Sequence, residues 1–253
     1  MNNRICALIP ARYNSSRLPG KPLLIIDGLS IIKRTYLQTR KSKLIKKIFV
    51  LTDDEKIQAE IIEIGGEVLM MKEDCLNGTE RICKCLKFIN NNYDVIVNVQ
   101  GDEPFIDPNH IDYAIEKYLE NERDENMVCT TIHYHILDEK ELYNRSIGKM
   151  IVDKFNNILY CSRSLIPHTK SGSHDKSTKY YGHIGLFIFR RNYLMIYMEE
   201  NTNAQLAEDI EWLKILEQGY KIKSFEVKNY EIGINTMEDY KYLIEKYQNS
   251  KKF

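Results

Sequence analysis

The feature that most constrains the fold is a repeated alternation, in the first half of the chain, of short apolar runs with segments of helical spacing. The apolar runs are ICALIP (5–10), KKIFVLTD (46–53), EVLMM (67–71) and YDVIVNVQGD (93–102). Helical spacing lies between them, at 30–39, 54–64 and 79–90. Strands that are apolar without alternation are buried on both faces, and helices are the usual crossovers between parallel strands. The pattern predicts an α/β fold, with a mostly parallel twisted sheet and helices on both faces.

From about residue 127 the pattern changes. Strand-like runs follow one another with few helices between them, at 127–136, 149–155, 157–162 and 183–190. We expect a smaller mixed or antiparallel segment, over about 127–190, inside a single domain that spans 1–253. The polar stretch 168–182 is rich in Ser, Gly and Lys and predicts a flexible loop, either a lid or an insertion.

The chain then returns to an alternating pattern. A helix over 203–218, a strand over 221–227 and a helix over 236–248 are expected. Thr236 and Asp239 have the spacing of a capping box, with Asp in place of the usual Glu.

Charge and apolar content exclude several function classes. The 253 residues contain 36 Lys and Arg against 36 Asp and Glu, which removes the overall attraction that a nucleic-acid or anionic-membrane binder carries. No apolar run approaches the roughly 20 residues that span a bilayer, and the N-terminal residues lead into a strand instead of a signal peptide. We therefore expect a cytosolic protein without nucleic-acid or membrane partners. The six cysteines form no CxxC pair and are expected to be reduced thiols.

Ligands of open parallel sheets bind beyond the carboxyl ends of the strands, so the residues that follow each strand are the candidates for a site. After the first strand, PARYNSSRLPGKPL (10–23) places Arg12, Arg17 and Lys21 among small residues. It is neither a dinucleotide fingerprint nor a P-loop, because the glycine spacing fits neither. Its three cations and its backbone N–H groups favour a polyphosphate. A solvated basic loop is the alternative.

Three further segments follow this rule. In NGTERI (77–82) a helix opens beside Arg81, and its N–H groups suit an anion or a base, although an ordinary helix cap explains it too. In VNVQGDEPFI (97–106) a carboxylate pair ends a buried strand, and Asp102 is the better of the two as a Mg²⁺ ligand. In EIGINTMEDY (231–240) Asn235 precedes a capped helix, where a polar turn residue is the simpler interpretation.

Taken in this order, these blocks resemble the cytidylyltransferases that activate 3-deoxy-manno-octulosonate (Kdo) as its CMP derivative. YCSRSLIP and HIGLFIFR match that family as well, so the resemblance runs from residue 9 to 240. It implies a Rossmann-like nucleotidyltransferase that forms a homodimer and uses CTP, an acidic sugar and Mg²⁺.

The resemblance also implies roles for individual residues. Catalysis falls to Arg17, Lys21 and Asp102. The nucleotide site comprises Ala11, Arg12, Arg17, Lys21, Asn77, Gly78, Arg81 and Gln100. The sugar site comprises Arg163, His183, Phe187, Glu211 and Trp212. The metal ligands are Asp102 and Asn235.

The chain departs from the family's pattern at the metal and sugar sites. Asn235 and Met237 stand where the family has Asp and Pro, so the metal site loses one negative charge. Phe187 and Trp212 stand where it has Tyr and Gln, and each change removes a hydrogen-bonding group. Such losses alter which polar ligand is preferred, so the sugar is either Kdo or a modified relative such as an amino or acylated sugar. Both aromatic residues also fit an ordinary core.

Other hypotheses remain open at this stage. The same fold serves an enzyme for another acid or amino sugar, such as a nonulosonate, and Asn235 is compatible with a nucleotide-binding homologue of weakened activity. His133 and His135 share one face of a strand, which suits a metal, but no third ligand is near in the sequence and a packed or solvated pair is the simpler interpretation.

Overall fold

The structure is a computed structural model that describes residues 4–14, 18–170, 174–198 and 200–249. Arg17, and part of the predicted loop 168–182, lie outside the described residues.

Strands and helices alternate in the first half as predicted. The strands are β1 (Ile5–Ala11), β2 (Ile25–Ile26), β3 (Leu29–Ser30), β4 (Lys47–Thr52), β5 (Glu67–Met70), β6 (Val95–Val99), β7 (Met127–His135), β8 (Lys149–Val152), β9 (Ile158–Ser162), β10 (Tyr181–Arg190) and β11 (Lys221–Glu226). The α-helices are α1 (Ile31–Thr39), α2 (Glu55–Glu63), α3 (Gly78–Cys85), α4 (Pro108–Asn121), α5 (Glu139–Tyr143), α6 (Arg191–Ile196), α7 (Asn203–Glu208), α8 (Leu213–Glu217) and α9 (Met237–Asn249). The 3₁₀ helices are η1 (Lys21–Leu23) and η2 (Leu86–Phe88).

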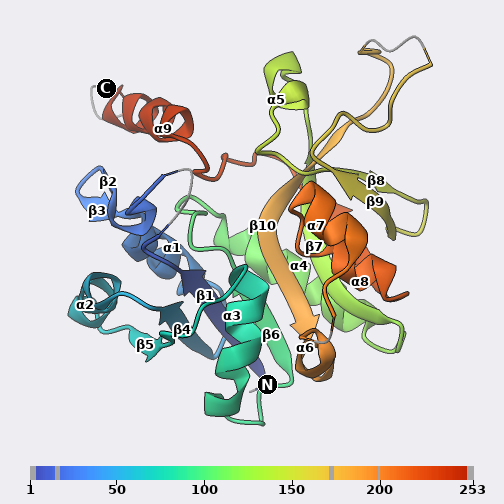
Figure 1. The fold of residues 1–253 in the computed structure, drawn as a ribbon. Coiled ribbons are helices and arrows are strands. Elements are labelled where there is room, and N and C mark those ends of the chain that lie inside the picture. Colours follow the sequence, from blue (N-terminus) through green and yellow to red (C-terminus); the bar gives the residue numbers. More distant parts are fainter. Residues whose placement is uncertain (1–3, 15–17, 171–173, 199, 250–253) are drawn as a thin grey trace.

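The main sheet has the strand order β11-β7-β10-β6-β1-β4-β5, with β8 and β9 attached beside β10. Strands β6, β1, β4 and β5 pair in parallel, and so do β11 and β7. Since β10 is antiparallel to both β6 and β7, it alone runs against the other strands of that row. The β8–β9 hairpin is antiparallel throughout. The mostly parallel sheet and the mixed segment after residue 127 are thus confirmed (Figure 1).

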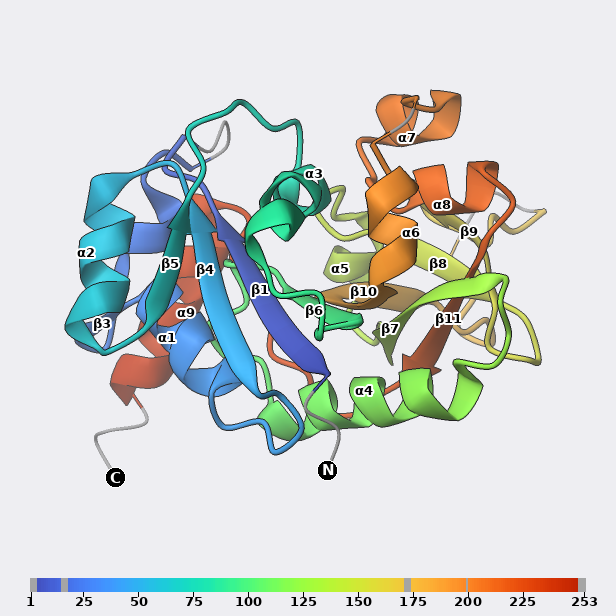
Figure 2. The ribbon, with the colours of Figure 1, turned by 90° about the horizontal axis from the view of Figure 1, so that it is seen from below.

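Helices cover both faces of this sheet because successive side chains of a strand point to opposite faces. In β1, Cys6 and Leu8 pack in a cluster with α3, α6 and α8. Ile5, Ala7 and Ile9 face the other way and pack with α1, α2 and α4. Figure 2 shows the sheet between these two layers, with α4 below it and α3, α6 and α8 above.

The C-terminal helix α9 packs against the β2–β3 turn. Ile234 and Leu243 form a small separate core with Leu18, Ile26 and Ile31. The predicted capping box is confirmed: the Thr236 N–H donates to the Asp239 carboxylate at 2.8 Å, and the Asp239 N–H donates to the Thr236 hydroxyl at 3.2 Å.

The predicted helix over 203–218 is wrong as a single element. It is broken into α7 and α8 at Asp209, whose φ of 51° is left-handed. The Arg163 guanidinium donates to the backbone carbonyls of Glu208 and Asp209 at 3.2 and 2.7 Å, and so binds oxygens that a continuous helix would use itself.

Smaller differences occur elsewhere. The predicted helix over 79–90 ends as α3 and continues as the 3₁₀ turn η2, and Tyr181 and Gly182, predicted in a loop, belong to β10. Helices α4, α5 and α6 have no counterpart in the sequence predictions. Within the described ranges, no helix is both long and apolar enough to span a membrane.

Candidate active site

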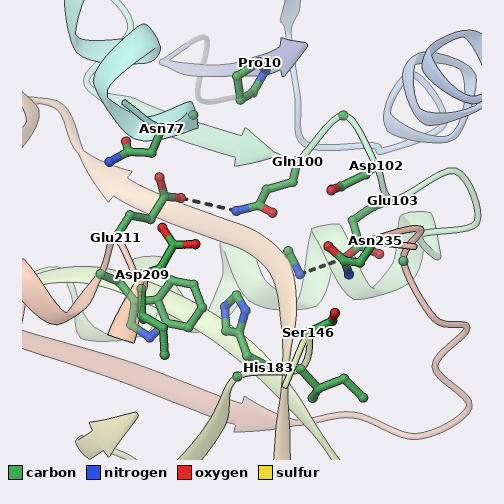
Figure 3. A pocket seen from close by; sticks show the side chains of 18 of the residues that line it. Pro10, Asn77, Gln100, Asp102, Glu103, Ser146, His183, Asp209, Glu211 and Asn235 are labelled. Atoms are coloured by element: carbon green, nitrogen blue, oxygen red, sulfur yellow. Dashed lines mark hydrogen bonds between the residues drawn. The ribbon is translucent and has the colours of Figure 1, made fainter. Parts of the chain in front are cut away.

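A cavity of about 540 Å³ opens at the carboxyl ends of the parallel strands. The segments after β1 and β6, the start of α3, the bulged part of β10 and the turn before α9 form its walls (Figure 3). All but two of the residues predicted for the site line it. These are Ala11, Arg12, Lys21, Asn77, Gly78, Arg81, Gln100, Asp102, Arg163, His183, Glu211, Trp212 and Asn235. The two exceptions are Arg17, which is not described, and Phe187, which lies in the core.

Lys21 and Asp102 meet at one wall of the cavity. The Lys21 ammonium lies 2.6 Å from the Asp102 carboxylate and donates at 2.9 Å to the carbonyl of Ile234. The backbone N–H of Ile234 in turn donates to the Asp102 carbonyl at 2.9 Å. Three segments far apart in the sequence are therefore joined where the early cations and the strand-end carboxylate were expected to meet.

Glycines allow these segments to approach one another. A Cβ on Gly101 would lie 2.7 Å from the Pro10 carbonyl oxygen, so only glycine lets the end of β6 pack against the end of β1. Gly20 precedes Lys21 with a φ of 69°, a conformation that side chains other than glycine rarely adopt.

Arg81 and Arg12, both predicted for the nucleotide site, lie in different surroundings. The guanidinium of Arg81 is buried, pairs with Asp53 at 2.8 Å and donates to the Met71 carbonyl at 2.8 Å. It therefore holds the loop that precedes α3, although it also borders the cavity. Arg12 is exposed at the cavity, and no hydrogen-bond or ion-pair partner is found for its side chain among the described residues.

The start of α3 is capped from two directions. The Asn77 side chain accepts from the Glu80 N–H at 2.8 Å, which is an ordinary N-cap. The Glu211 carboxylate accepts from the Thr79 N–H at 3.1 Å and from the Gln100 amide nitrogen at 3.2 Å. Burial raises the pKa of Glu211, and the nearby charge of Asp102 acts in the same direction. Because Gln100 donates to Glu211, its amide oxygen is left as the acceptor on the cavity side.

A cluster of aromatic rings forms one end of the cavity. The His183 ring lies against Trp212 with 4.0 Å between ring centroids, and against Phe187 with 4.7 Å. The Trp212 indole N–H donates to the Cys161 sulfur at 2.9 Å, so its single donor is already used. Phe187 is completely buried behind these rings.

Arg163 also differs from the simple expectation of an arginine that faces the sugar. Its guanidinium donates to the backbone carbonyls of Ser146, Glu208 and Asp209 at 3.0, 3.2 and 2.7 Å. It borders the cavity while it fixes two of the segments that surround it.

The residues that could hold a metal are Asp102 and Asn235, which face the same part of the cavity (Figure 3). In the described part of the chain there is no group of three or more His, Cys, Asp or Glu side chains arranged as a metal site. One carboxylate and one amide oxygen still suit Mg²⁺, which completes its coordination with water and substrate phosphates. His133 is packed: its Nδ1 lies 2.7 Å from the Ser224 hydroxyl, and burial lowers its pKa to about 4.

Sequence reasoning passed over Glu103 in favour of Asp102, and missed other residues of the cavity wall. Glu103 is buried, accepts from the Gly185 N–H at 3.0 Å and from the Tyr230 hydroxyl at 3.1 Å, and borders the cavity. The missed residues include Asn144, Ser146, Gln205, Asp209 and Tyr230. The sequence feature that relates to Glu103 is the pair of glycines at 185 and 233. A Cβ at either position would lie within 3 Å of a Glu103 carboxyl oxygen.

Comparison with known proteins agrees with this site. The chain matches the family described as Cytidylyltransferase over residues 6–225. It is 38% identical over 242 residues to the 3-deoxy-manno-octulosonate cytidylyltransferase of Protochlamydia amoebophila, covering 94% of this chain and 92% of that protein. It is 39% identical over 238 residues to the mitochondrial enzyme of that name from Arabidopsis thaliana, covering 94% of this chain and 81% of that protein.

A solved structure is similar along its whole length. It is the CMP:2-keto-3-deoxy-manno-octonic acid synthetase complexed with CTP, with a TM-score of 0.87 and 29% identity, covering 98% of this chain and 99% of that one. By fold, by the arrangement of its cavity and by these similarities, the chain belongs to the 3-deoxy-manno-octulosonate cytidylyltransferase family.

Proposed function

We propose that this protein transfers CMP from CTP to Kdo, or to a close relative of Kdo, with release of pyrophosphate. The observation that carries the proposal is the junction of Lys21 and Asp102, 2.6 Å apart, at one wall of the cavity. A cation and a carboxylate so close together suit a triphosphate with its counter-ion. The proteins of this family to which the chain is similar carry that activity in their names.

The chemistry that the residues supply is positional and electrostatic. A sugar hydroxyl attacks the α-phosphorus of CTP, the bond from that phosphorus to the bridging oxygen breaks, and pyrophosphate leaves. Negative charge grows on oxygens near Lys21, and Arg12, an exposed residue that also borders the cavity, adds positive charge. Arg17 belongs to the same basic segment and is proposed to act with them. Pre-positioned cations of this kind supply most of the catalysis in phosphoryl and nucleotidyl transfer.

Beside the N-terminus of α3, the cavity offers hydrogen-bond acceptors to the nucleotide and to the sugar. Asn77, Gly78 and Gln100 all border the cavity, and His183 stands in its wall among the aromatic rings. Holding both reactants in one cavity turns their encounter into an intramolecular step, which typically lowers the barrier by several kcal/mol.

We propose Mg²⁺ as the cofactor, held by Asp102 and Asn235. When bound, it would neutralise phosphate charge and orient the triphosphate. Lys21 contacts one Asp102 oxygen and leaves the other available. Since Asn235 contributes no charge, we expect weaker metal binding than with two carboxylates.

Asn235→Asp tests this metal site. The variant adds a carboxylate beside Asp102 and is expected to lower the Mg²⁺ concentration needed for half-maximal turnover by about tenfold, the size of one charged interaction. Titration of the steady-state rate with Mg²⁺ at saturating CTP measures it. An unchanged Mg²⁺ dependence would show that Asn235 is not a ligand.

The sugar is the least constrained part of the proposal. The indole N–H of Trp212 is engaged with Cys161 and Phe187 has no polar group, so neither side chain offers a donor to a sugar. This favours a modified relative of Kdo as a substrate to be tested beside Kdo. An enzyme for a nonulosonate and a weakened nucleotide-binding homologue remain the alternatives.

We also propose a homodimer, a single domain over 1–253 and a cytosolic location. The β8–β9 hairpin carries Phe155, Leu159 and Tyr160 with 61%, 60% and 39% of their surface exposed. Exposed large apolar side chains on one hairpin support a protein contact there.

An activity panel tests the function. Pyrophosphate release is measured with CTP, UTP, ATP and GTP against Kdo, amino and acylated relatives of Kdo, and a nonulosonate, with and without Mg²⁺. Turnover with CTP and Kdo or a relative supports the proposal. Turnover only with a nonulosonate changes the acceptor, and CTP binding without any turnover indicates the weakened homologue.

A further inference from the structure

Strand β10 is irregular at the point where it borders the cavity. Its pairing with β7 matches His183 with His133 and Phe187 with Thr131, so three residues of β10 lie opposite the single residue Ile132. Such a bulge bends a strand and redirects its side chains, and bulges are common beside active sites.

Polar groups hold the two sides of this bulge. The Gly185 N–H donates to Glu103 at 3.0 Å, and its carbonyl accepts from the Gln100 N–H at 2.9 Å. On the other side, the hydroxyl of Thr131 lies 2.6 Å from the Leu186 carbonyl and 3.0 Å from Nε2 of His183. Thr131 itself is completely buried and does not border the cavity.

The Thr131 hydroxyl has one proton to donate. A carbonyl oxygen can only accept, so the proton of Thr131 goes to Leu186. The hydroxyl oxygen must then accept from His183, which requires a proton on Nε2.

The ring of His183 is also kept neutral. It is packed between Phe187 and Trp212, and this burial, helped by the charge of Arg163, lowers its pKa to about 3. A neutral ring protonated at Nε2 carries a lone pair on Nδ1. No partner for Nδ1 is found in the part of the chain that the structure describes, and the ring stands in the cavity wall (Figure 3).

We propose that Thr131 is a positioning residue: it fixes His183 as the Nε2–H tautomer, so that Nδ1 accepts a hydrogen bond from a hydroxyl of the bound sugar. The proposal rests on the sugar-activating function proposed above, but its structural half is independent of the substrate. Gln100 offers a second acceptor to the same cavity through its amide oxygen. The cavity thus offers two side-chain acceptors to ligand groups that donate.

Three variants of buried threonines separate this role from a general contribution to folding. Thr131→Val keeps the shape and removes the hydroxyl, whereas Thr131→Ser keeps the hydroxyl. Thr130→Val is the matched control: Thr130 is the neighbouring residue, equally buried, and its hydroxyl donates to the Ala114 carbonyl at 3.3 Å on the helix α4 side.

The first measurement is the ¹⁵N chemical shift of both ring nitrogens of His183 in the ligand-free full-length protein at neutral pH. The His183→Gln spectrum identifies the resonances. The neutral Nε2–H tautomer is expected in the wild type, in Thr131→Ser and in Thr130→Val, and a mixture or the Nδ1–H tautomer in Thr131→Val. An Nδ1–H tautomer or a charged ring in the wild type, or an unaltered Thr131→Val spectrum, overturns the proposal.

The second measurement is steady-state kinetics with the sugar that the panel identifies. In Thr131→Val the KM for the sugar is expected to rise about tenfold, the size of one neutral hydrogen bond, while kcat and the KM for CTP change little. Thr131→Ser restores the KM, and Thr130→Val leaves it unchanged.

The two measurements test separate claims. A wild type without sugar turnover contradicts the proposed function, and the ring shifts still decide whether Thr131 sets the tautomer. A shifted tautomer with an unchanged sugar KM overturns the role of Nδ1 in sugar binding.

Discussion

At the scale of single residues, Glu103 shows how the cavity constrains a side chain. Its carboxyl is packed against Gly185 and Gly233, and the Tyr230 hydroxyl and the Gly185 N–H both donate to it. Burial, and then the charge of Asp102, raise its pKa to about 8. Glu103 therefore holds a proton at neutral pH, while Asp102 beside it carries the charge that Lys21 pairs with.

This raised pKa makes stability depend on pH. The unfolded chain releases the Glu103 proton near pH 4.5, and the folded protein only near 8. In between, the folded state binds the extra proton, so the contribution of Glu103 is fully present below about pH 4.5 and is lost as the pH rises to about 8. The lowered pKa values of His133 and His183 act in the opposite direction, since their contribution is lost as the pH falls below about 6.5.

Glu103→Gln isolates the first effect, because Gln resembles the protonated acid and does not titrate. We expect the Tm of the wild type to fall relative to that of Glu103→Gln by at least about 5 °C between pH 5 and pH 9. Thermal unfolding of both proteins across this range measures the difference. Parallel pH curves would mean that Glu103 is already ionised in the folded protein.

At the scale of elements, the connection between α5 and β8 is held by a buried ammonium group. Lys149 is completely buried, and its Nζ donates to the backbone carbonyls of Asn144, Ile147 and Arg163 at 2.7, 2.9 and 2.9 Å. Burial lowers its pKa to about 8. With the Arg163 guanidinium, it fixes the loop 144–148, which borders the cavity near His183 and Trp212.

Lys149→Met keeps a long unbranched side chain, one atom shorter, and removes the ammonium group that donates all three hydrogen bonds. Carbonyls left without partners are expected to cost about 1–3 kcal/mol of stability, and the loosened loop should exchange its amide protons faster and raise the KM for the sugar. Thermal unfolding and hydrogen exchange over 144–148 measure this. Lys72→Met is the control, because the Lys72 side chain is 75% exposed. Equal effects of the two changes would contradict the role of Lys149.

The elements that the sequence predicted are those with a local signal. The apolar runs of β1, β4, β6 and β10 can be recognised from the sequence without knowing which strands they pair with. Helix α4 also has a local signal, since Asp107 caps it and Pro108 opens it, but no prediction was made from them. Helices α5 and α6, of five and six residues, are too short for a helical period to be recognised.

At the scale of the whole molecule, the cavity lies where the parallel strands meet the mixed segment. Basic and acidic groups come from the ends of β1 and β6, whereas His183 comes from β10 and Trp212 from the turn before α8. Strand order predicts that residues at carboxyl ends converge, which is why Lys21 and Asp102 could be predicted as neighbours. The backbone carbonyls that accept from Arg163 and Thr131 could not be predicted, because the bulge and the break at Asp209 bring them close.

Assembly is tested at this scale with Leu159→Lys. A charge in place of this exposed apolar side chain of the β8–β9 hairpin is expected to convert a dimer into a monomer in sedimentation equilibrium. Ile62→Lys is the control: Ile62 is 57% exposed on α2, at the opposite side of the molecule (Figure 1). A monomeric wild type, or a dimer that survives Leu159→Lys, contradicts the proposed interface.

The central claim is that Lys21 and Asp102 act together on one triphosphate. A double-mutant cycle of Lys21→Met and Asp102→Asn, read as kcat/KM for CTP in proteins whose folding is verified by circular dichroism, tests it most directly. Each single change is expected to lower kcat/KM by about 10²-fold or more, and the double variant by little more than either, because groups that work as a unit are not additive. Fold losses that simply multiply in the double variant would contradict the claim.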